Sequence, residues 1–370
     1  MPGSDLSFLS VYGKNWIDDY LEKEYHGASK FWNKETARQF ASVDIETLLF
    51  DEYFLNGKSW IYPGIADVIF EIHEEMKKRP IHLIAVAGGI GTGKTSGVLA
   101  IMNWLSWYKF TCKFKEDSQM VCPQEFYGLK PTSKVAFIAL SKTLDKSKQI
   151  TFSEMKSAFV SQFNKDYFPI NERKKSQIEI EANNTVVFPN TATEASNAGW
   201  SIYSFCMDEI SFLDIIDSSS RSRGQAEDVY DQAQAAYNSA YGRMFSRFGG
   251  DGLGVITSSV NFDEDFLMKK MRQIYTGTAV EPSADSCYMK IIIPWEINAA
   301  KWNKSKKFFY FDTENYKIIK EKKEVIALNK YFIESRLEDI VFGNTDNDPN
   351  DQLLKDVRTG KITVEGEKDE

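Results

Sequence analysis

One stretch constrains the fold of this chain more than any other: residues 81–100, which read IHLIAVAGGIGTGKTSGVLA. An apolar segment, 83–88, leads into a glycine-rich turn and then into a run with helical character. The spacing from Gly88 to Gly93-Lys94-Thr95 matches the phosphate-binding pattern G-x-x-x-x-G-K-[ST]. Glycine permits the backbone torsions with which a loop wraps a phosphate, and the following helix directs its N-terminus at the same anion. The sequence therefore predicts a nucleotide-binding loop.

Each part of this loop has an expected task. Lys94 is expected to reach the β- and γ-phosphates, and the Thr95 hydroxyl is expected to bind Mg²⁺. Upstream, Trp60 and Tyr62 offer rings that can stack on adenine, although packing of a helix onto the sheet is the explanation that we favour for them. The predicted nucleotide-binding residues are Gly88, Gly89, Ile90, Gly91, Thr92, Gly93, Lys94, Thr95 and Ser96.

A second apolar strand, 202–207, runs directly into Asp208-Glu209. Asp208 is expected to hold Mg²⁺ through water. Glu209 is expected to polarise the attacking water, which makes Glu209 and Lys94 the predicted catalytic residues. Acids also follow strands wherever a strand reaches solvent, so the pattern alone leaves surface acids as an alternative. Asp208-Glu209 follows the phosphate loop in the sequence, with one strand between them. This order favours an active site over ordinary surface acids.

A third strand, 253–256, ends in polar residues that are predicted to sense the γ-phosphate: Thr257, Ser258 and Ser259. The alternative is an ordinary strand end with turn-forming residues. Rapid hydrolysis of a nucleotide also calls for an arginine that stabilises the transition state, and the phosphate loop contains none. The sequence leaves four candidates for this arginine: Arg221, Arg223, Arg243 and Arg247.

Apolar strand-like runs alternate with amphipathic helices along the chain, which predicts an α/β fold with a mostly parallel sheet covered by helices on both faces. A hairpin is expected around Asn183-Asn184. Helices are predicted over 65–76, 95–108, 152–163 and 324–339, and a further helix is expected to be capped by Asp263.

Net charge, cysteine spacing and the distribution of apolar residues limit the possible functions and cellular locations of the protein. The formal net charge of −8 excludes a uniformly basic surface for nucleic acid, so any such surface has to be local. The four cysteines lack metal-ligand spacing and fit a reducing compartment. No secretory signal and no membrane-spanning apolar run is evident in the sequence, which predicts a cytosolic protein.

The order of these motifs resembles the ATPase domain of the large terminase subunit of tailed bacteriophages. The resemblance covers roughly residues 60–300 and rests on the phosphate loop, KVAFIALSK, IEIEANNTVVFPNT, SFCMDEISFLD, YGRMFSRFG, GVITSSVNF and PWEIN. It implies a P-loop NTPase of the ASCE/RecA-like type with a Walker A loop at 88–95, a Walker B pair at Asp208-Glu209 and a coupling motif at 257–259. It also implies ATP and Mg²⁺ as cofactors.

The same resemblance implies a motor that drives double-stranded DNA into a procapsid. Its partners are then DNA, a portal protein that carries a homo-oligomeric ring of the motor, and the small terminase subunit. Its location is the cytoplasm of the infected bacterial host, transiently at the portal.

The expected organisation is a helical N-terminal segment over 1–60, a P-loop ATPase domain over 61–300 and a helical, charged extension or linker over 301–370. The nuclease domain of the family is not evident after Asn298, so we expect either an ATPase fragment or a nuclease on another polypeptide. Two alternatives to the motor stay open. One is a helicase of superfamily 1 or 2 or another DNA-dependent ATPase, and the other is a nucleotide-switched binding or assembly module.

Overall fold

The structure is a computed structural model. It describes residues 32–114, 123–193, 197, 199–213, 215–216, 230–259, 265–278, 283–297, 309–312 and 317–321. The expected helical content before Trp32 and the helix predicted over 324–339 lie outside these residues.

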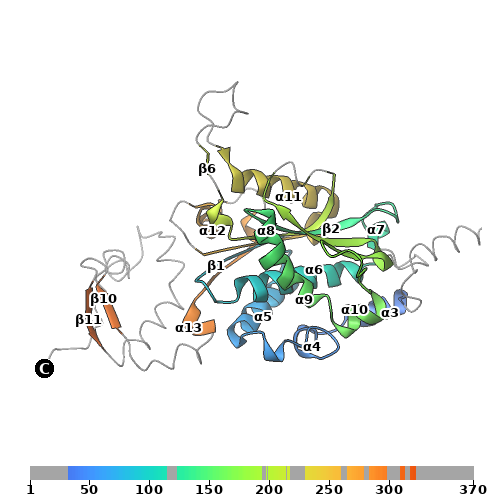
Figure 1. The fold of residues 1–370 in the computed structure, drawn as a ribbon, viewed down its shortest axis with the longest axis horizontal. Helices are drawn as coiled ribbons and strands as arrows, with labels where there is room; N and C mark the ends of the chain where they lie inside the picture. The colour runs from blue at the N-terminus through green and yellow to red at the C-terminus, as the bar shows by residue number, and fades with distance from the viewer. Residues whose placement is uncertain are drawn as a thin grey trace, which may run out of the picture.

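A seven-stranded sheet with the order β3-β4-β2-β5-β8-β1-β9 forms the centre of the fold (Figure 1). Every pair of neighbours is parallel except β3 and β4, which form the hairpin predicted around Asn183-Asn184. Strand β8 lies between β1, which leads into the phosphate loop, and β5, which leads into Asp208. The strands are β1 Leu83–Gly88, β2 Val135–Ser141, β3 Ile178–Ile180, β4 Thr185–Thr191, β5 Ser201–Asp208, β8 Leu253–Ser258 and β9 Cys287–Ile292.

Two further strand pairs are antiparallel. Strands β6 Ile215–Ile216 and β7 Tyr230–Asp231 form one, and β10 Phe309–Asp312 and β11 Lys317–Glu321 form the other. The second pair lies in the segment 301–370, which was expected to be a helical, charged extension or linker, and it comes before the helix predicted over 324–339.

Helices cover both faces of the central sheet (Figure 1). They are α3 Lys34–Ala41, α4 Ile45–Phe50, α5 Pro63–Lys78, η2 Lys94–Leu99, α6 Ala100–Thr111, α7 Pro123–Phe126, α8 Leu144–Lys146, η3 Ser147–Thr151, α9 Phe152–Ala158, α10 Gln162–Tyr167, α11 Gln232–Phe248, α12 Phe266–Tyr275 and α13 Pro294–Ile297. Short 3₁₀ turns occur at η1 Gly57–Ser59, η4 Glu181–Asn183, η6 Ile210–Phe212, η7 Gly249–Asp251 and η8 Ala284–Ser286.

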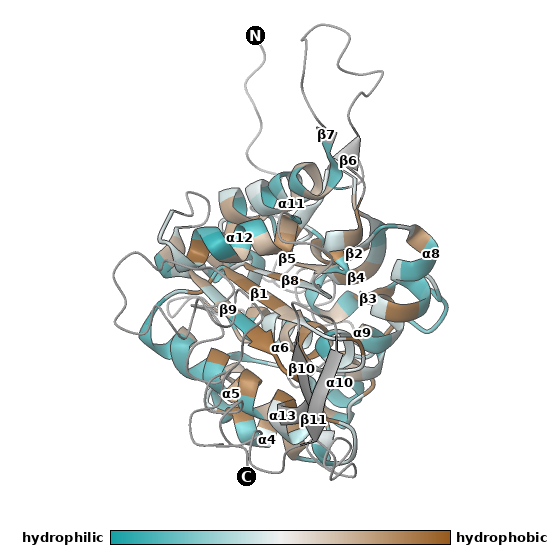
Figure 2. Ribbon diagram, turned by 90° about the vertical axis from the view of Figure 1, so that its left-hand side faces the viewer, coloured by the Kyte–Doolittle hydropathy of each residue, from teal (hydrophilic) through white to brown (hydrophobic). Residues whose placement is uncertain are grey.

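Alternate residues of β1 contribute to two separate hydrophobic cores. Ile84 and Val86 join the core formed with α5, α6 and α9. Leu83 and Ala85 join the core formed with α11 and α12 on the other face. Strand β1 carries the hydrophobic colour in Figure 2, as expected of a strand buried on both faces. The predicted helix-covered parallel sheet is confirmed.

Three helix predictions differ from the structure in detail. The helix expected from residue 95 begins as a π-helix, η2, before it continues as α6. The helix expected over 152–163 is two helices, because Ser161 caps a second one with a hydrogen bond from Asn164 N. Asp265, and not Asp263, caps α12 by accepting a hydrogen bond of 2.9 Å from Met268 N. The N-cap is the residue whose side chain reaches the N2 or N3 amide, and the predicted cap, Asp263, lies outside the described residues.

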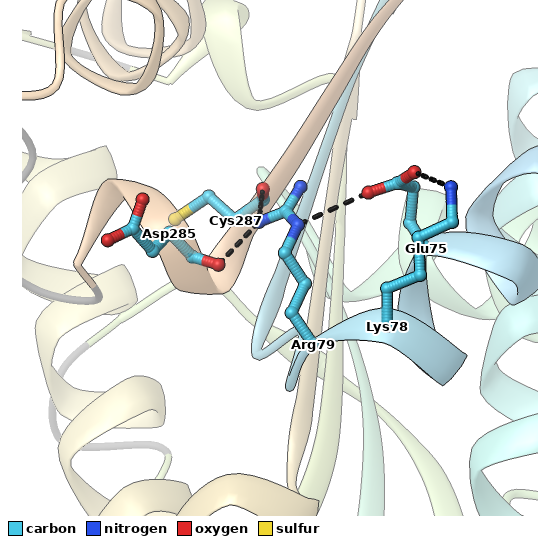
Figure 3. A network of polar contacts seen from close by, with 5 residues as sticks. All are labelled: Glu75, Lys78, Arg79, Asp285 and Cys287. Atoms are coloured by element: carbon cyan, nitrogen blue, oxygen red, sulfur yellow. Dashed lines mark hydrogen bonds and ion pairs between the residues drawn. The ribbon is translucent and has the colours of Figure 1, made fainter.

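The C-terminal end of α5 is hydrogen-bonded to the start of β9, the edge strand next to β1. Arg79 donates from Nη1 to the backbone oxygens of Asp285 and Cys287, and the bond to Cys287 is 3.0 Å long. Its Nε pairs with Glu75 at 3.2 Å, and Lys78 pairs with the same carboxylate at 2.8 Å (Figure 3). Since Cys287 begins β9, this network fixes α5 against the strand that flanks β1.

Helix α5 also packs closely on η2, and this contact leads to a stability prediction. A Cβ on Gly97 would lie 2.5 Å from Cγ2 of the buried Ile65. We expect Gly97→Ala to lower the free energy of unfolding by about 1–3 kcal/mol, because overpacking forces the two helices apart. Gly242→Ala in α11 is the matched control, since a Cβ there meets no atom within 4 Å. Its expected effect is a gain of about 0.5–1 kcal/mol. Urea unfolding of both variants tests the prediction, and equal midpoints would contradict it.

Candidate active site

The phosphate loop follows β1 at the carboxyl edge of the sheet. Gly91 and Gly93 have φ angles of 78° and 86°, in the left-handed region that favours glycine. The ammonium of Lys94 donates to Gly88 O at 2.8 Å and to Gly89 O at 3.0 Å. Ile90 at the tip of the loop is 90% exposed. The loop therefore encloses its lysine and turns its apolar tip outward.

The carboxylate of Asp208 is the polar centre of the site. It is buried at the end of β5 and accepts hydrogen bonds from three hydroxyls. Thr257 Oγ1 lies 3.0 Å from Oδ1, Thr151 Oγ1 lies 3.0 Å from Oδ2, and Thr95 Oγ1 lies 3.1–3.2 Å from both oxygens. The three hydroxyls come from β8, η3 and η2. Segments that are far apart in the chain thus meet at one carboxylate.

Burial shifts the two charged groups of this centre toward their neutral forms. Burial raises the pKa of Asp208, and the charge of Glu209 adds to this, whereas the hydrogen bonds from Thr257, Thr151 and Thr95 oppose it. Burial lowers the pKa of Lys94, and the negative charges of Glu209 and Asp208 oppose that shift. A cation bound beside Asp208 would favour its ionised form.

Glu209 stands beside the tip of β8. Ser259 N donates to its Oε2 at 3.1 Å, Ser258 Oγ lies 3.3 Å from the same oxygen, and Ser259 Oγ lies 3.4 Å from Oε1. Ser259 Oγ also lies 3.2 Å from Lys94 Nζ. Glu209 has a φ of 51°, a left-handed conformation that is rare outside glycine and concentrates at functional sites. The structure thus brings together the predicted members of the loop, of the acidic pair and of the third strand.

The donor set of this cluster fits Mg²⁺. A threonine hydroxyl and a carboxylate are hard oxygen ligands, and Mg²⁺ in nucleotide sites takes one or two such groups together with phosphate oxygens. Thr95 Oγ1 and the Asp208 carboxylate are 3.1–3.2 Å apart at the first turn of the helical run, next to the loop. The buried negative charge of Asp208 has hydroxyls as its hydrogen-bond donors, and a divalent cation would compensate it.

Of the four arginine candidates, the two that the structure describes do not join this cluster. Arg221 and Arg223 lie outside the described residues. Arg247 donates from Nη1 to Ser201 Oγ at 2.6 Å, and Ser201 begins β5 at the edge of the sheet opposite the loop. Arg243 precedes it by one turn of α11 and so lies on the same helix face. Neither of these two reaches the phosphate loop of its own chain.

The two aromatic residues upstream of α5 are only partly covered. Trp60 is 38% exposed and Tyr62 is 37% exposed. A Cβ on Gly93 would lie 3.4 Å from Tyr62 Cδ2, so this ring stands against the phosphate loop. A ring that is one-third exposed beside the loop has a free area on which a base can stack.

Sequence reasoning missed Thr151. Its hydroxyl bonds to Asp208 and lies 3.2 Å from that of Ser141 at the end of β2. In the sequence, the apolar run KVAFIAL is followed by Ser141 and further polar residues. Parallel strands deliver the residues that follow them to one edge of the sheet, which points to the end of β2 in general, but Thr151 lies ten residues beyond Ser141 and no local pattern marks it.

The comparison with family models decides the class of this chain. The model described as the N-terminal P-loop domain of the uncharacterized protein MJ0330 matches residues 29–321. The chain belongs to this family. Membership confirms the predicted P-loop fold, and a P-loop domain implies nucleotide binding. Comparison with curated proteins found no match.

Three solved structures are similar to this P-loop protein. The large terminase of a thermophilic bacteriophage is 10% identical with a TM-score of 0.40, over 62% of this chain and 45% of that one. The HK97 bacteriophage large terminase is 10% identical with a TM-score of 0.41, over 88% and 52%. The Phi-28 gp11 DNA packaging motor is 11% identical with a TM-score of 0.29, over 60% and 58%. The matches thus span about half the length of these chains, and likenesses this distant carry no conclusion about function.

Within the part of the chain that the structure describes, no helix is both long and apolar enough to cross a membrane.

Proposed function

We propose that this P-loop protein is an ATPase that converts ATP and water to ADP and phosphate. One observation carries the proposal: the Ser259 hydroxyl lies within 3.4 Å of both Lys94 Nζ and Glu209 Oε1. A lysine suited to hold the γ-phosphate is therefore linked through one hydroxyl to a carboxylate suited to accept a proton. A nucleotide-switched binding module needs no such base, so the arrangement favours hydrolysis.

Each group has a distinct task in the proposed reaction. The backbone amides of the loop and the Lys94 ammonium bind the β- and γ-phosphates. Thr95 and Asp208 hold Mg²⁺, which when bound neutralises the charge of the phosphates. Glu209 orients the attacking water and accepts its proton. Ser258 and Ser259 fix the Glu209 carboxylate, and Ser259 senses the γ-phosphate through Lys94.

We assign the energy of this reaction to movement of double-stranded DNA, as in a packaging motor. The support is the order of the motifs along the chain, which resembles that of large terminase subunits. A motor of this kind works as a ring on a portal protein in the host cytoplasm, together with a small terminase subunit. Arg247 bonds to Ser201 at the opposite end of β5 from Asp208, so an arginine finger contributed by Arg247 would have to act on a neighbouring subunit.

ATP turnover by the purified chain, with and without double-stranded DNA, tests this function. We expect Mg²⁺-dependent hydrolysis of ATP that DNA stimulates at about 50 mM salt and stimulates far less at about 200 mM, because phosphate contacts weaken steeply with salt. Heparin is the control for a general polyanion effect. Binding of ATP without turnover in any condition would favour the switch module. Stimulation by single-stranded but not by double-stranded DNA would favour the helicase.

A further inference from the structure

The three hydroxyls around Asp208 are not equivalent. Under the proposed function, on which this inference rests, Thr95 is a metal ligand and turns its oxygen toward Mg²⁺. Its hydrogen bonds of 3.1–3.2 Å to Asp208 would weaken when the metal binds. Thr257 and Thr151 keep their bonds of 3.0 Å, one to each carboxylate oxygen. A carboxylate that is held at both oxygens cannot rotate about its last side-chain bond.

Thr151 is placed for this task by two anchors at the end of β2. Ser147 Oγ, at the start of η3, donates to Ala139 O at 2.9 Å. Ser141 Oγ lies 3.2 Å from Thr151 Oγ1. All three side chains are buried, and Thr151 is 1% exposed. Because β2 pairs with β5 up to Leu140 and Met207, the strand that carries η3 is in fixed register with the strand that carries Asp208.

We infer that Thr151 is a positioning residue for the metal. Its hydroxyl holds Asp208 Oδ2 and so fixes the orientation of the carboxylate that would hold Mg²⁺. Groups that orient the ligands of a metal contribute about 10–100-fold to its affinity. Thr257 performs the same task from β8, but Thr257 belongs to the motif over 257–259, which is predicted to sense the γ-phosphate. Thr151 comes from outside the three predicted motifs.

Two substitutions separate the hydroxyl from the shape of the side chain. Thr151→Val keeps the branched shape and removes the donor, whereas Thr151→Ser keeps the donor. The readout is Mn²⁺ binding, followed by electron paramagnetic resonance, in the presence of a non-hydrolysable ATP analogue. We expect Thr151→Val to weaken Mn²⁺ binding by about tenfold or more and Thr151→Ser to restore it to within about threefold. Affinity for the analogue in EDTA should stay unchanged in both variants.

Thr111→Val is the matched control, because it removes an equally buried hydroxyl that bonds to Asn183 at the far end of α6. It should lower thermal stability without changing Mn²⁺ affinity. Unchanged Mn²⁺ affinity in Thr151→Val overturns the inference. So does a loss of analogue binding in EDTA that matches the loss of Mn²⁺, because it would mean that Thr151 only supports the fold. A wild type that binds neither metal nor analogue overturns the proposed function itself, and the two failures are therefore distinguishable.

Discussion

Glu209→Gln is expected to lower the rate of ATP hydrolysis by about 10²–10⁴-fold and to leave ATP bound. An amide keeps the shape of the side chain and can still accept hydrogen bonds from Ser259 N and Ser258 Oγ. It cannot accept a proton from water. Lys94, which we propose holds the phosphates, retains its contacts with Gly88 and Gly89. Single-turnover hydrolysis and binding of a fluorescent ATP analogue measure the two effects separately.

Glu154→Gln in α9 provides the control for the loss of one carboxylate, since Glu154 lies outside the site cluster. Its turnover should match that of the wild type. If Glu209→Gln hydrolyses ATP within about threefold of the wild type, Glu209 is not the base and the proposed mechanism is wrong. If the variant loses ATP binding as well, Glu209 supports the site rather than the reaction.

Lys94→Ala is expected to weaken ATP binding by about 10–100-fold and to abolish hydrolysis. A hydrogen bond to a charged group contributes about 1.5–3 kcal/mol, and the lysine is expected to make such bonds to the β- and γ-phosphates. Calorimetric titration with ATP and with adenosine tests this expectation. The affinity for adenosine should not change, because the nucleoside has no phosphate for the lysine to bind.

Lys148→Ala is the control for the loss of one positive charge, because Lys148 lies on the exposed side of η3. It should bind ATP as tightly as the wild type. A Lys94→Ala variant that binds ATP normally would show that the loop over 88–96 is not the phosphate site. An equal loss of adenosine and ATP binding would indicate general damage to the fold, which thermal unfolding would reveal.

The parts of the site that could be predicted are those that depend on local sequence and on sheet polarity. The glycines at 91 and 93 predict positive φ angles, because few other residues adopt such angles. Asp208 and Thr257 could be assigned to one edge because each ends an apolar strand, and parallel strands end together. Their pairing, Asp208 with Thr257 in β5 and β8, follows from that polarity.

The parts that could not be predicted depend on packing between distant segments. The bond from Thr151 to Asp208 requires the path of η3 after β2, which local patterns do not reveal. The break between α9 and α10 is equally hidden, because the apolar spacing of 152–163 continues across it. There Phe163 N bonds to Tyr53 O, a contact that a helix running through would not allow. The partner of Arg247 likewise depends on where α11 lies over β5.

The strand order has a consequence for how the chain folds. Strand β1 obtains its two neighbours late, since Leu83 pairs with Gly254 on one side and with Cys287 on the other. During synthesis, both edges of β1 therefore stay unpaired until β8 and then β9 have been synthesised. Contacts between such distant segments close slowly, and unpaired strand edges promote aggregation. Chain pieces that stop before Ile292 lack part of β9, the second neighbour of β1, and should be prone to misfold. Because β1 leads into the phosphate loop, the nucleotide site is assembled only after β9 has been synthesised.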